Sequence, residues 1–452
     1  QSINPATEAL IKTYAPMHDS HVQSSLSDAQ AAFTNWRGRA LAQRQELILA
    51  LADTLERTAD ENARLMSLEM GKTLTASYAE LEKCAAFCRH MAGHAKAYLA
   101  DQPVETEHVA AYSRPLPLGV ILLVMPWNFP FWQVIRVAVP AILAGNTCVL
   151  KHASNVPGCA LALQDGFEAA GLPKGVFQSL LISSGEVEAV INDPRIKAAS
   201  LTGSERAGAA VAAQCGKALK KTVLELGGSD AFIVMPSANL PAAVDAAITG
   251  RMRNNGQSCI AAKRMIIHED IYDEFRAAYL ARLDAIIIGN PMDSATDIGP
   301  LASESARRDT QKQLDKAAAQ GASLRQSRQN IPERGFYIRP AILENITPDM
   351  DIYSAEIFAP IAMFFKTANL DDAIMLANDS PYGLSSVLFT QDKAEMDIAI
   401  NALEAGSTFI NRYSSPDIRR PFGGIKNSGY GREIARAGMP EFTNLKTVII
   451  AE

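Results

Sequence analysis

Cys259 is the residue of this chain best suited to act as a nucleophile. It ends a polar, glycine-bearing segment, Asn255-Gly256-Gln257-Ser258-Cys259, and none of the five other cysteines has such neighbours. A thiol attacks only as its thiolate, which requires partial exposure and nearby donors or positive charge. Cys259 is therefore a candidate for covalent catalysis, if the chain also supplies the partners that such chemistry needs.

Two other polar residues follow short apolar segments that we predict to be strands. Asn128 lies in the sequence PWNFP at 126–130, where its amide can donate either to a substrate oxyanion or to local backbone. Glu225 begins the sequence ELGG. A carboxylate at a strand end can act as a base, although an ordinary exposed glutamate has the same sequence signature.

Three further segments suit a bound phosphate or a close approach of backbone to a ligand. Gly203 and Ser204 follow a predicted strand and open a predicted helix, an arrangement that favours an anion. The spacing is not GxGxxG, so a structural turn is an equal alternative. Glu356 and Phe358 precede another predicted strand, and the loop at 421–429 is dense in turn residues.

The elements that position these residues form two α/β series. The 452 residues exceed what one hydrophobic core supports. Apolar residues recur at helical spacing between 27 and 100, and strands then alternate with helices from 120 and again from 239. This order predicts two doubly wound α/β units, packed together with an active site between them. The predicted strands are 120–124, 147–150, 177–181, 198–201 and 223–226, then 265–268, 361–365, 386–389 and 408–410.

Two segments, 109–116 and 445–450, look like strands that belong to neither unit. We expect them to form a small projecting sheet, whose free edge would pair with another subunit. A simple surface hairpin is the alternative.

The composition excludes several classes of partner. A net charge of −6 gives no basic surface for nucleic acid or an anionic membrane. The longest apolar run, at 120–125, is too short to span a bilayer. Six cysteines without a regular spacing indicate reduced thiols and a cytoplasmic protein. His90 and His94 lie four residues apart but have no evident third ligand, so we assign no metal site.

Taken together, the motifs resemble those of the NAD(P)-dependent aldehyde dehydrogenase superfamily. They occur in the family's order over essentially the whole chain: PWNFP, the strand end at Lys151, GSxxxG, ELGG, GQxC, ExFxP and PFGGxKxSGxGRE. The resemblance implies that Cys259 is the nucleophile and that Asn128, with the backbone N–H of Cys259, forms the oxyanion hole. Glu225 would be the base that activates water.

The resemblance also implies a domain plan. Two Rossmann-like domains would comprise residues 1–105 with 120–235, which bind the cofactor, and residues 236–437, which carry the catalytic cysteine. Residues 106–119 and 438–452 would form an oligomerisation element of a homodimer or homotetramer.

NAD or NADP is the implied cofactor. Glu356 would hold the nicotinamide ribose beside Phe358, Lys151 the adenine ribose and Ser204 the pyrophosphate. In NAD-preferring members a glutamate often occupies the position of Ser154, and its absence here makes NADP acceptable, so we expect use of both. Ala359 replaces the family's usual glycine, which should affect packing only. The full set of expected cofactor contacts is Trp127, Lys151, Ser154, Gly203, Ser204, Glu356 and Phe358.

Two arginines narrow the substrate. Arg136 lies eight residues after Asn128 and Arg253 six before Cys259, offsets that match carboxylate-binding arginines in bacterial succinate-semialdehyde dehydrogenases. A guanidinium forms paired hydrogen bonds with a carboxylate, although either arginine alone could be a surface ion pair. Arg419 and Arg420 would add positive charge at the substrate entrance.

The predicted reaction is therefore oxidation of succinate semialdehyde to succinate. Dehydrogenases for glutarate semialdehyde or for a neutral aliphatic aldehyde are the alternatives within the family. A cofactor-free cysteine hydrolase, which would not need Lys151, Ser204 or Glu356, and a non-catalytic relative are those from other classes. Ala261 stands where some relatives have a second cysteine, so we expect no disulfide switch at Cys259.

Overall fold

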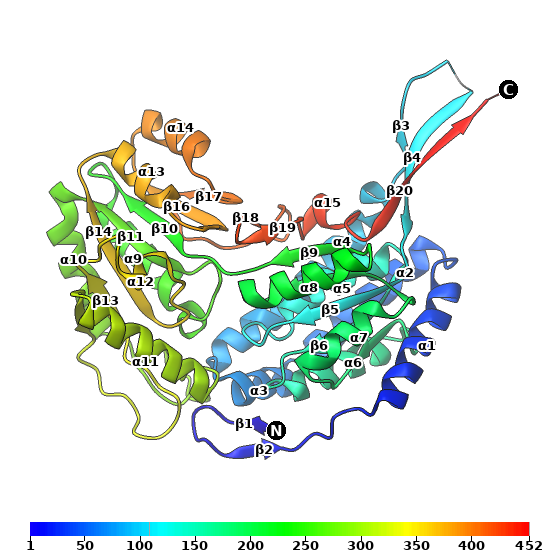
Figure 1. Ribbon diagram of the computed structural model, residues 1–452, viewed down its shortest axis with the longest axis horizontal. Helices are drawn as coiled ribbons and strands as arrows, with labels where there is room; N and C mark the ends of the chain where they lie inside the picture. The colour runs from blue at the N-terminus through cyan, green and yellow to red at the C-terminus, as the bar shows by residue number, and fades with distance from the viewer. Residues whose placement is uncertain (108, 452) are drawn as a thin grey trace.

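The computed structural model describes residues 1–107 and 109–451 and contains two large, mainly parallel sheets (Figure 1). The first sheet has six strands in the order β19-β9-β8-β5-β6-β7, with only β19 antiparallel. The chain leaves the central strand β5 in both directions, which is the doubly wound topology predicted from the sequence. Its strands are β5 (Val120–Met125), β6 (Thr147–His152), β7 (Phe177–Ser179), β8 (Ile196–Thr202), β9 (Lys221–Glu225) and β19 (Gly429–Tyr430).

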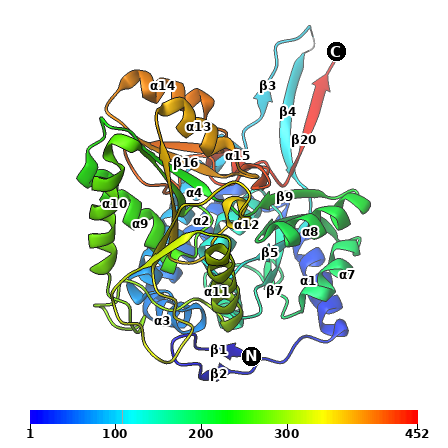
Figure 2. The same ribbon diagram turned by 60° about the vertical axis from the view of Figure 1, so that its left-hand side comes forward.

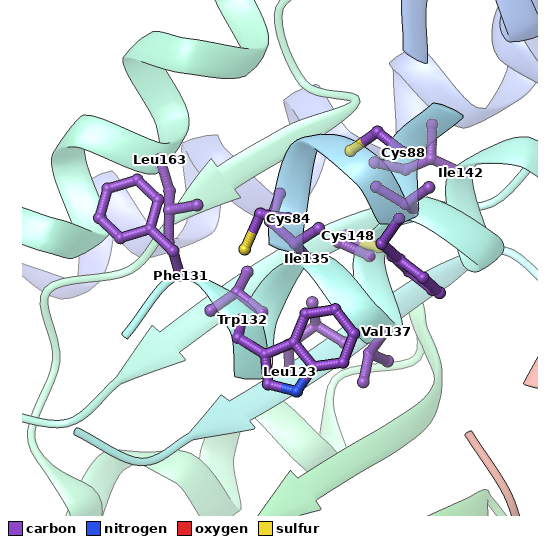
Figure 3. Close-up of a cluster of buried hydrophobic side chains, with 14 of the residues drawn as sticks. Cys84, Cys88, Leu123, Phe131, Trp132, Ile135, Val137, Ile142, Cys148 and Leu163 are labelled. Atoms are coloured by element: carbon purple, nitrogen blue, oxygen red, sulfur yellow. The ribbon is translucent and has the colours of Figure 1, made fainter. Parts of the chain in front are cut away.

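Helices cover both faces of this sheet because its strands are apolar on both sides. Ile121 and Leu123 of β5 join one buried cluster, and Val120 and Leu122 join another on the opposite face. Figure 3 shows part of the first cluster, where side chains of α4 and α5 pack over the sheet. The first face is covered by α2 (Leu41–Arg57), α3 (Ala59–Met70), α4 (Leu74–Tyr98), α5 (Trp132–Leu143) and α6 (Pro157–Ala169), and the second by α1 (Asp19–Trp36), α7 (Val187–Asn192) and α8 (Glu205–Lys217).

The second sheet has seven strands in the order β12-β13-β14-β11-β10-β16-β17, and only β12 is antiparallel. It too is buried on both faces, so the predicted pair of doubly wound units is confirmed. The strands are β10 (Asp230–Val234), β11 (Ala262–His268), β12 (Ser323–Gln326), β13 (Ala341–Glu344), β14 (Ile361–Thr367), β16 (Ser385–Phe389) and β17 (Ser407–Ile410). The helices are α9 (Leu240–Met252), α10 (Glu269–Asp284), α11 (Glu304–Ala319), α12 (Asp351–Ser354), α13 (Leu370–Asn378) and α14 (Lys393–Ala402).

The pairing of two strands refines the predicted division of the chain. β10 belongs to the second sheet although it precedes the expected boundary at 235/236, and β19 returns from the C-terminal region to pair with β9 of the first. The expected strands near 109–116 and 445–450 form β4 (Ala110–Pro117) and β20 (Thr443–Ile450), which pair along their whole length. With β3 (Gln102–Pro103) they project from the body (Figures 1 and 2).

Several elements were not predicted from the sequence, among them the strands β10, β12 and β13 and the helices α11, α13 and α14. Helix α11 buries only Thr310, Leu314 and Ala317, too narrow an apolar stripe to stand out in a strongly polar segment. The remaining short elements are β1 (Ser2–Ile3), β2 (Leu10–Lys12), β15 (Tyr382–Gly383), β18 (Ile425–Lys426) and α15 (Ala435–Gly438). No helix among the described residues is both long and apolar enough to cross a membrane.

Candidate active site

Cys259 lies in the connection between α9 and β11, which bends sharply because three successive residues have left-handed backbone. The φ angles of Asn254, Asn255 and Gly256 are +56°, +58° and +74°. At Gly256 only glycine fits, since a Cβ there would lie 2.4 Å from the backbone nitrogen of Pro360. This connection, residues 253–261, carries the candidate nucleophile, and we call it the nucleophile loop. It packs directly against Pro360, the residue that precedes β14.

Buried donors hold the nucleophile loop in this shape. The fully buried guanidinium of Arg251 donates to the carbonyl oxygens of Gly256, at 3.2 Å, and Ile357, at 2.8 Å. The amide nitrogen of Asn254 donates to the carbonyl oxygen of Asn128 at 2.8 Å. The loop is thus tied both to the end of β5 in one unit and to the approach to β14 in the other.

Asn128 is placed beside this loop as the sequence predicted. Its side-chain amide is buried and donates to the carbonyl oxygen of Gln257 at 3.2 Å. An amide NH2 group carries two donors, so this contact leaves one hydrogen for another acceptor. Because Asn128 and Cys259 line the same pocket, that acceptor can be an oxygen of a molecule bound to the sulfur.

Two pockets meet at Cys259. The first, which we call the strand-end pocket, lies beyond the ends of β5, β8 and β9 and is lined, besides Cys259, by Trp127, Asn128, Gly203, Ser204, Glu356 and Phe358. The second, the basic pocket, lies between α4, α5 and the nucleophile loop. It is lined, besides Cys259, by Lys83, Phe129, Trp132, Arg136, Arg253 and Phe422. A molecule in either pocket can therefore reach the sulfur.

Five of the seven expected cofactor contacts line the strand-end pocket. The rings of Trp127 and Phe358 meet edge to face, with centroids 5.7 Å apart. Ser204 caps α8, its hydroxyl accepting from the backbone N–H of Ala207 at 3.4 Å. The two others lie outside this pocket: Lys151 is buried near the end of β6, and Ser154 is exposed two residues beyond it.

Glu356 is held by Lys263, a residue that sequence reasoning did not single out. The carboxylate of Glu356 pairs with the Lys263 ammonium at 2.9 Å and accepts a hydrogen bond from the backbone N–H of Gly228 at 3.1 Å. The same ammonium is fully buried and donates to the carbonyl oxygen of Cys259 at 2.7 Å. Lys263 therefore ties the backbone of Cys259 to Glu356. The available signal was a lysine four residues after the cysteine, where a buried strand begins.

Glu225 lines neither of the two pockets. Its side chain points at the 421–429 loop, where a Cβ on Gly423 would come within 2.7 Å of the carboxylate. Both carboxylate oxygens are buried without a hydrogen-bond partner among the described residues. Burial, reinforced by the negative charge of Glu433, raises the pKa of Glu225 well above the usual range of a carboxyl. The protonated form is thereby favoured in this position.

The sulfur of Cys259 faces opposing influences. Cys259 is partly exposed, toward the two pockets. Burial of the thiol nevertheless raises its pKa to about 12. The positive charges of Arg136 and Lys263 lower this pKa, whereas the negative charges of Glu356 and Asp230 raise it. The thiol is thus the resting form, and nearby positive charge favours the thiolate needed for attack.

The two predicted substrate arginines reach the same pocket as Cys259. Arg136 is buried on α5, where its guanidinium pairs with Glu433 and donates to the hydroxyl of Thr202 at 3.2 Å. Arg136 therefore forms an ion pair, but this pair is buried and does not lie on the surface. Arg253 is half-buried at the start of the nucleophile loop. The offsets in sequence do bring both cations to one cavity.

Four other residues of interest, Arg419, Arg420, His90 and His94, lie away from the pockets. Arg419 is exposed and forms two hydrogen bonds with Asp417, at 2.9 and 2.6 Å, which largely neutralise its charge, and Arg420 is exposed beside it. His94 hydrogen-bonds the carbonyl oxygen of His90 at 2.8 Å. Within the part of the chain that the structure describes, no three His, Cys, Asp or Glu side chains gather as a metal site.

The chain belongs to the aldehyde dehydrogenase family, whose sequence profile matches residues 1–448. It is 50% identical over 453 residues to succinate-semialdehyde dehydrogenase (NADP+) 1 of Mycobacterium tuberculosis, covering 100% of this chain and 99% of that one. The corresponding enzyme of Mycobacterium leprae is also 50% identical over 453 residues, with the same coverage. The structure of succinic semialdehyde dehydrogenase from Streptococcus pyogenes, in complex with NADP+, superposes with a TM-score of 0.97. It is 36% identical and covers 100% of both chains. The resemblance inferred from the motifs is thus confirmed.

Proposed function

We propose that this protein oxidises succinate semialdehyde to succinate with NADP or NAD as the hydride acceptor. The observation that carries the proposal is the meeting of two different pockets at one cysteine. One is lined by cationic side chains that suit a carboxylate, and the other lies at strand ends that suit a dinucleotide. The names of the similar proteins support the same substrate and cofactor.

The strand-end pocket fits a dinucleotide on its own geometry. Ser204 opens α8, whose N-terminus favours a phosphate, and Gly203 leaves room for backbone to approach it. A Cβ on Gly227 would lie 2.6 Å from the carboxylate of Glu356, so the glycine keeps that carboxylate clear beside the pocket. Glu356 and Phe358 would hold the nicotinamide half and Lys151 and Ser154 the adenosine half. When bound, the cofactor supplies the hydride acceptor.

In the first half-reaction the Cys259 thiol loses its proton to solvent, and the resulting thiolate forms a bond with the aldehyde carbon. The carbonyl oxygen becomes an oxyanion, which accepts from the side-chain amide of Asn128 and the backbone N–H of Cys259. Loss of hydride from that carbon leaves a thioester on Cys259. The nucleophile loop holds the sulfur in place throughout, because its shape is fixed by Arg251 and Asn254.

The second half-reaction hydrolyses the thioester. Glu225, in its ionised form, removes a proton from water, and the resulting hydroxide adds to the thioester carbon. The carbon–sulfur bond then breaks, succinate leaves and the thiolate is restored. Because Glu225 lines neither pocket, it must approach the sulfur or act through water to do this.

The protein's assembly and location are part of the same proposal. The sheet of β3, β4 and β20 carries exposed apolar residues on β20, including Leu445, Ile449 and Ile450, which would be covered in a homodimer or homotetramer. All six cysteines lie among the described residues and none forms a disulfide, which supports a cytoplasmic location.

A substrate panel tests the proposed function directly. Succinate semialdehyde, glutarate semialdehyde and butanal are each offered with NADP and with NAD, and the reduced cofactor is followed by absorbance. We expect kcat/KM for succinate semialdehyde to exceed that for butanal, its neutral counterpart, by about tenfold or more. Equal values for these two aldehydes would contradict recognition of a carboxylate.

A further inference from the structure

The basic pocket contains more positive charge than its own carboxylates can balance. Lys83, Arg136 and Arg253 all line it. Arg136 is paired with Glu433. Lys83 and Arg253, by contrast, form no ion pair or hydrogen bond with any residue in the described part of the chain.

The carboxylates at this pocket are already occupied. Glu80 also lines the pocket, but it accepts from the backbone N–H groups of Phe131 and Trp132, at 2.8 and 2.9 Å, and pairs with Lys72. Its charge thus stabilises the start of α5 and a buried ammonium. Asp417, next to the pocket-lining Pro416, is bound by Arg419. The positive excess is therefore directed at the cavity.

Lys83 is held at the cavity wall. On α4 it follows three other pocket-lining residues, Ala76, Ala79 and Glu80, at the spacing of one helix face. Its ammonium lies 3.8 Å from the ring centroid of Trp132, which itself meets Phe87 edge to face at 5.3 Å (the indole is labelled in Figure 3). A cation over an indole face is attracted to it, so the ring fixes the position of the charge without neutralising it.

We propose that Lys83 and Arg253 together bind the distal carboxylate of the substrate, while Glu433 holds Arg136 in place beside them. This role rests on the proposed oxidation of an ω-carboxy aldehyde. It assigns recognition of the carboxylate in part to Lys83, which is not one of the two predicted arginines. Cations removed from water are costly unless paired, and a substrate carboxylate supplies the missing partner.

The protonation behaviour of Lys83 is consistent with this role. Burial, followed by the charges of Arg253 and Arg136, lowers its pKa to about 7, whereas Cys84 and Glu80 act in the opposite direction. A bound carboxylate stabilises the charged form. The preference for succinate semialdehyde over butanal should therefore decline as the pH rises above 7, because the free enzyme loses this charge. Ionisation of Cys259 affects both aldehydes and cancels in the ratio.

Steady-state kinetics of matched variants tests the assignment. Lys83→Met removes the charge but keeps an unbranched side chain, Lys83→Arg keeps the charge, and Lys96→Met removes an exposed charge from the same helix, away from the pocket. We expect Lys83→Met to raise KM for succinate semialdehyde by about tenfold or more, with kcat and the kinetics of butanal little changed. Lys83→Arg should largely restore KM and make the substrate preference independent of pH. Lys96→Met should resemble the wild type.

Protection of Cys259 from alkylation measures ligand binding without turnover and complements the steady-state kinetics. Succinate, as a non-reacting probe, should protect Cys259 from alkylation by iodoacetamide in the wild type and much less in Lys83→Met. An unchanged melting temperature of each variant excludes unfolding as the cause.

Two failures can be told apart. If the wild type shows no preference for succinate semialdehyde over butanal, the proposed function fails. If that preference is present but Lys83→Met leaves it intact, or impairs both aldehydes equally, the proposed function stands and the role of Lys83 is wrong.

Discussion

The two pockets that meet at Cys259 differ in how their charges are balanced. In the strand-end pocket the carboxylate of Glu356 is already paired with Lys263. Glycines such as Gly227 leave the space around that carboxylate. In the basic pocket Lys83 and Arg253 have no such partner within the described residues. One pocket is electrostatically complete by itself, and the other becomes complete only when an anion enters.

This difference indicates where selectivity resides. A pocket that is complete offers shape, hydrogen bonds and a helix N-terminus, which suit a cofactor common to many reactions. A pocket with unbalanced charge discriminates strongly, because a neutral aldehyde leaves the half-buried cations unpaired. Changes in the strand-end pocket should therefore affect all aldehydes alike, and changes in the basic pocket should alter the choice among them.

The largest effect should come from Glu225, which belongs to neither pocket. Replacing it with glutamine removes the base but keeps the shape of the side chain, so the thioester should form and then persist. We expect the burst of reduced cofactor to remain and the steady-state rate to fall by about a hundredfold or more, with every aldehyde. Rapid-mixing absorbance measurements distinguish the two phases. Loss of the burst would instead place Glu225 in the first half-reaction.

The pH dependence of hydrolysis follows from the same residue. Because burial and Glu433 raise the pKa of Glu225, its ionised form becomes populated only well above the usual range of a carboxyl. The rate of thioester hydrolysis in the wild type should therefore rise with pH and lose that dependence in Glu225→Gln. A wild-type rate that does not change with pH would contradict this prediction, because it would show that the Glu225 carboxylate is already ionised across the tested range.

Lys263 tests the strand-end pocket. Lys263→Met leaves Glu356 without its partner, so we expect cofactor binding to weaken by about tenfold while the ratio of kcat/KM between succinate semialdehyde and butanal is unchanged. Titration of cofactor binding by protein fluorescence gives the first quantity and steady-state kinetics the second. A change in the aldehyde ratio would show that the two pockets are not separable at Cys259.

The smallest expected effect concerns the choice between the two cofactors. Ser154→Glu places a negative charge at an exposed position where the family's NAD-preferring members often have one. We expect KM for NADP to rise several-fold, through repulsion of the 2′-phosphate, with KM for NAD unchanged. Ser154→Gln is the control for size. Equal effects on both cofactors would place Ser154 away from the ribose.

The sequence was most informative where a single residue type was decisive. Cys259, Asn128 and the two arginines come together as expected, because their neighbours in sequence also fix their neighbours in space. Lys83, Lys263 and Glu433 were missed, because what matters in each is a partner from a distant segment or the lack of one. The same limit applied to β10, since only its pairing with β11 and β16 assigns it to the second sheet.

The pairing of β19 with β9 has a consequence for biosynthesis. Glu225 ends β9, and its partner in that pairing, Gly429, comes 204 residues later in the chain. While the polypeptide is being made, the outer edge of β9 therefore stays uncovered until these 204 residues have also been synthesised. The strand that carries the proposed base is therefore enclosed only after this later segment is made, and a chain truncated before residue 429 would expose a β-strand edge prone to association with other chains.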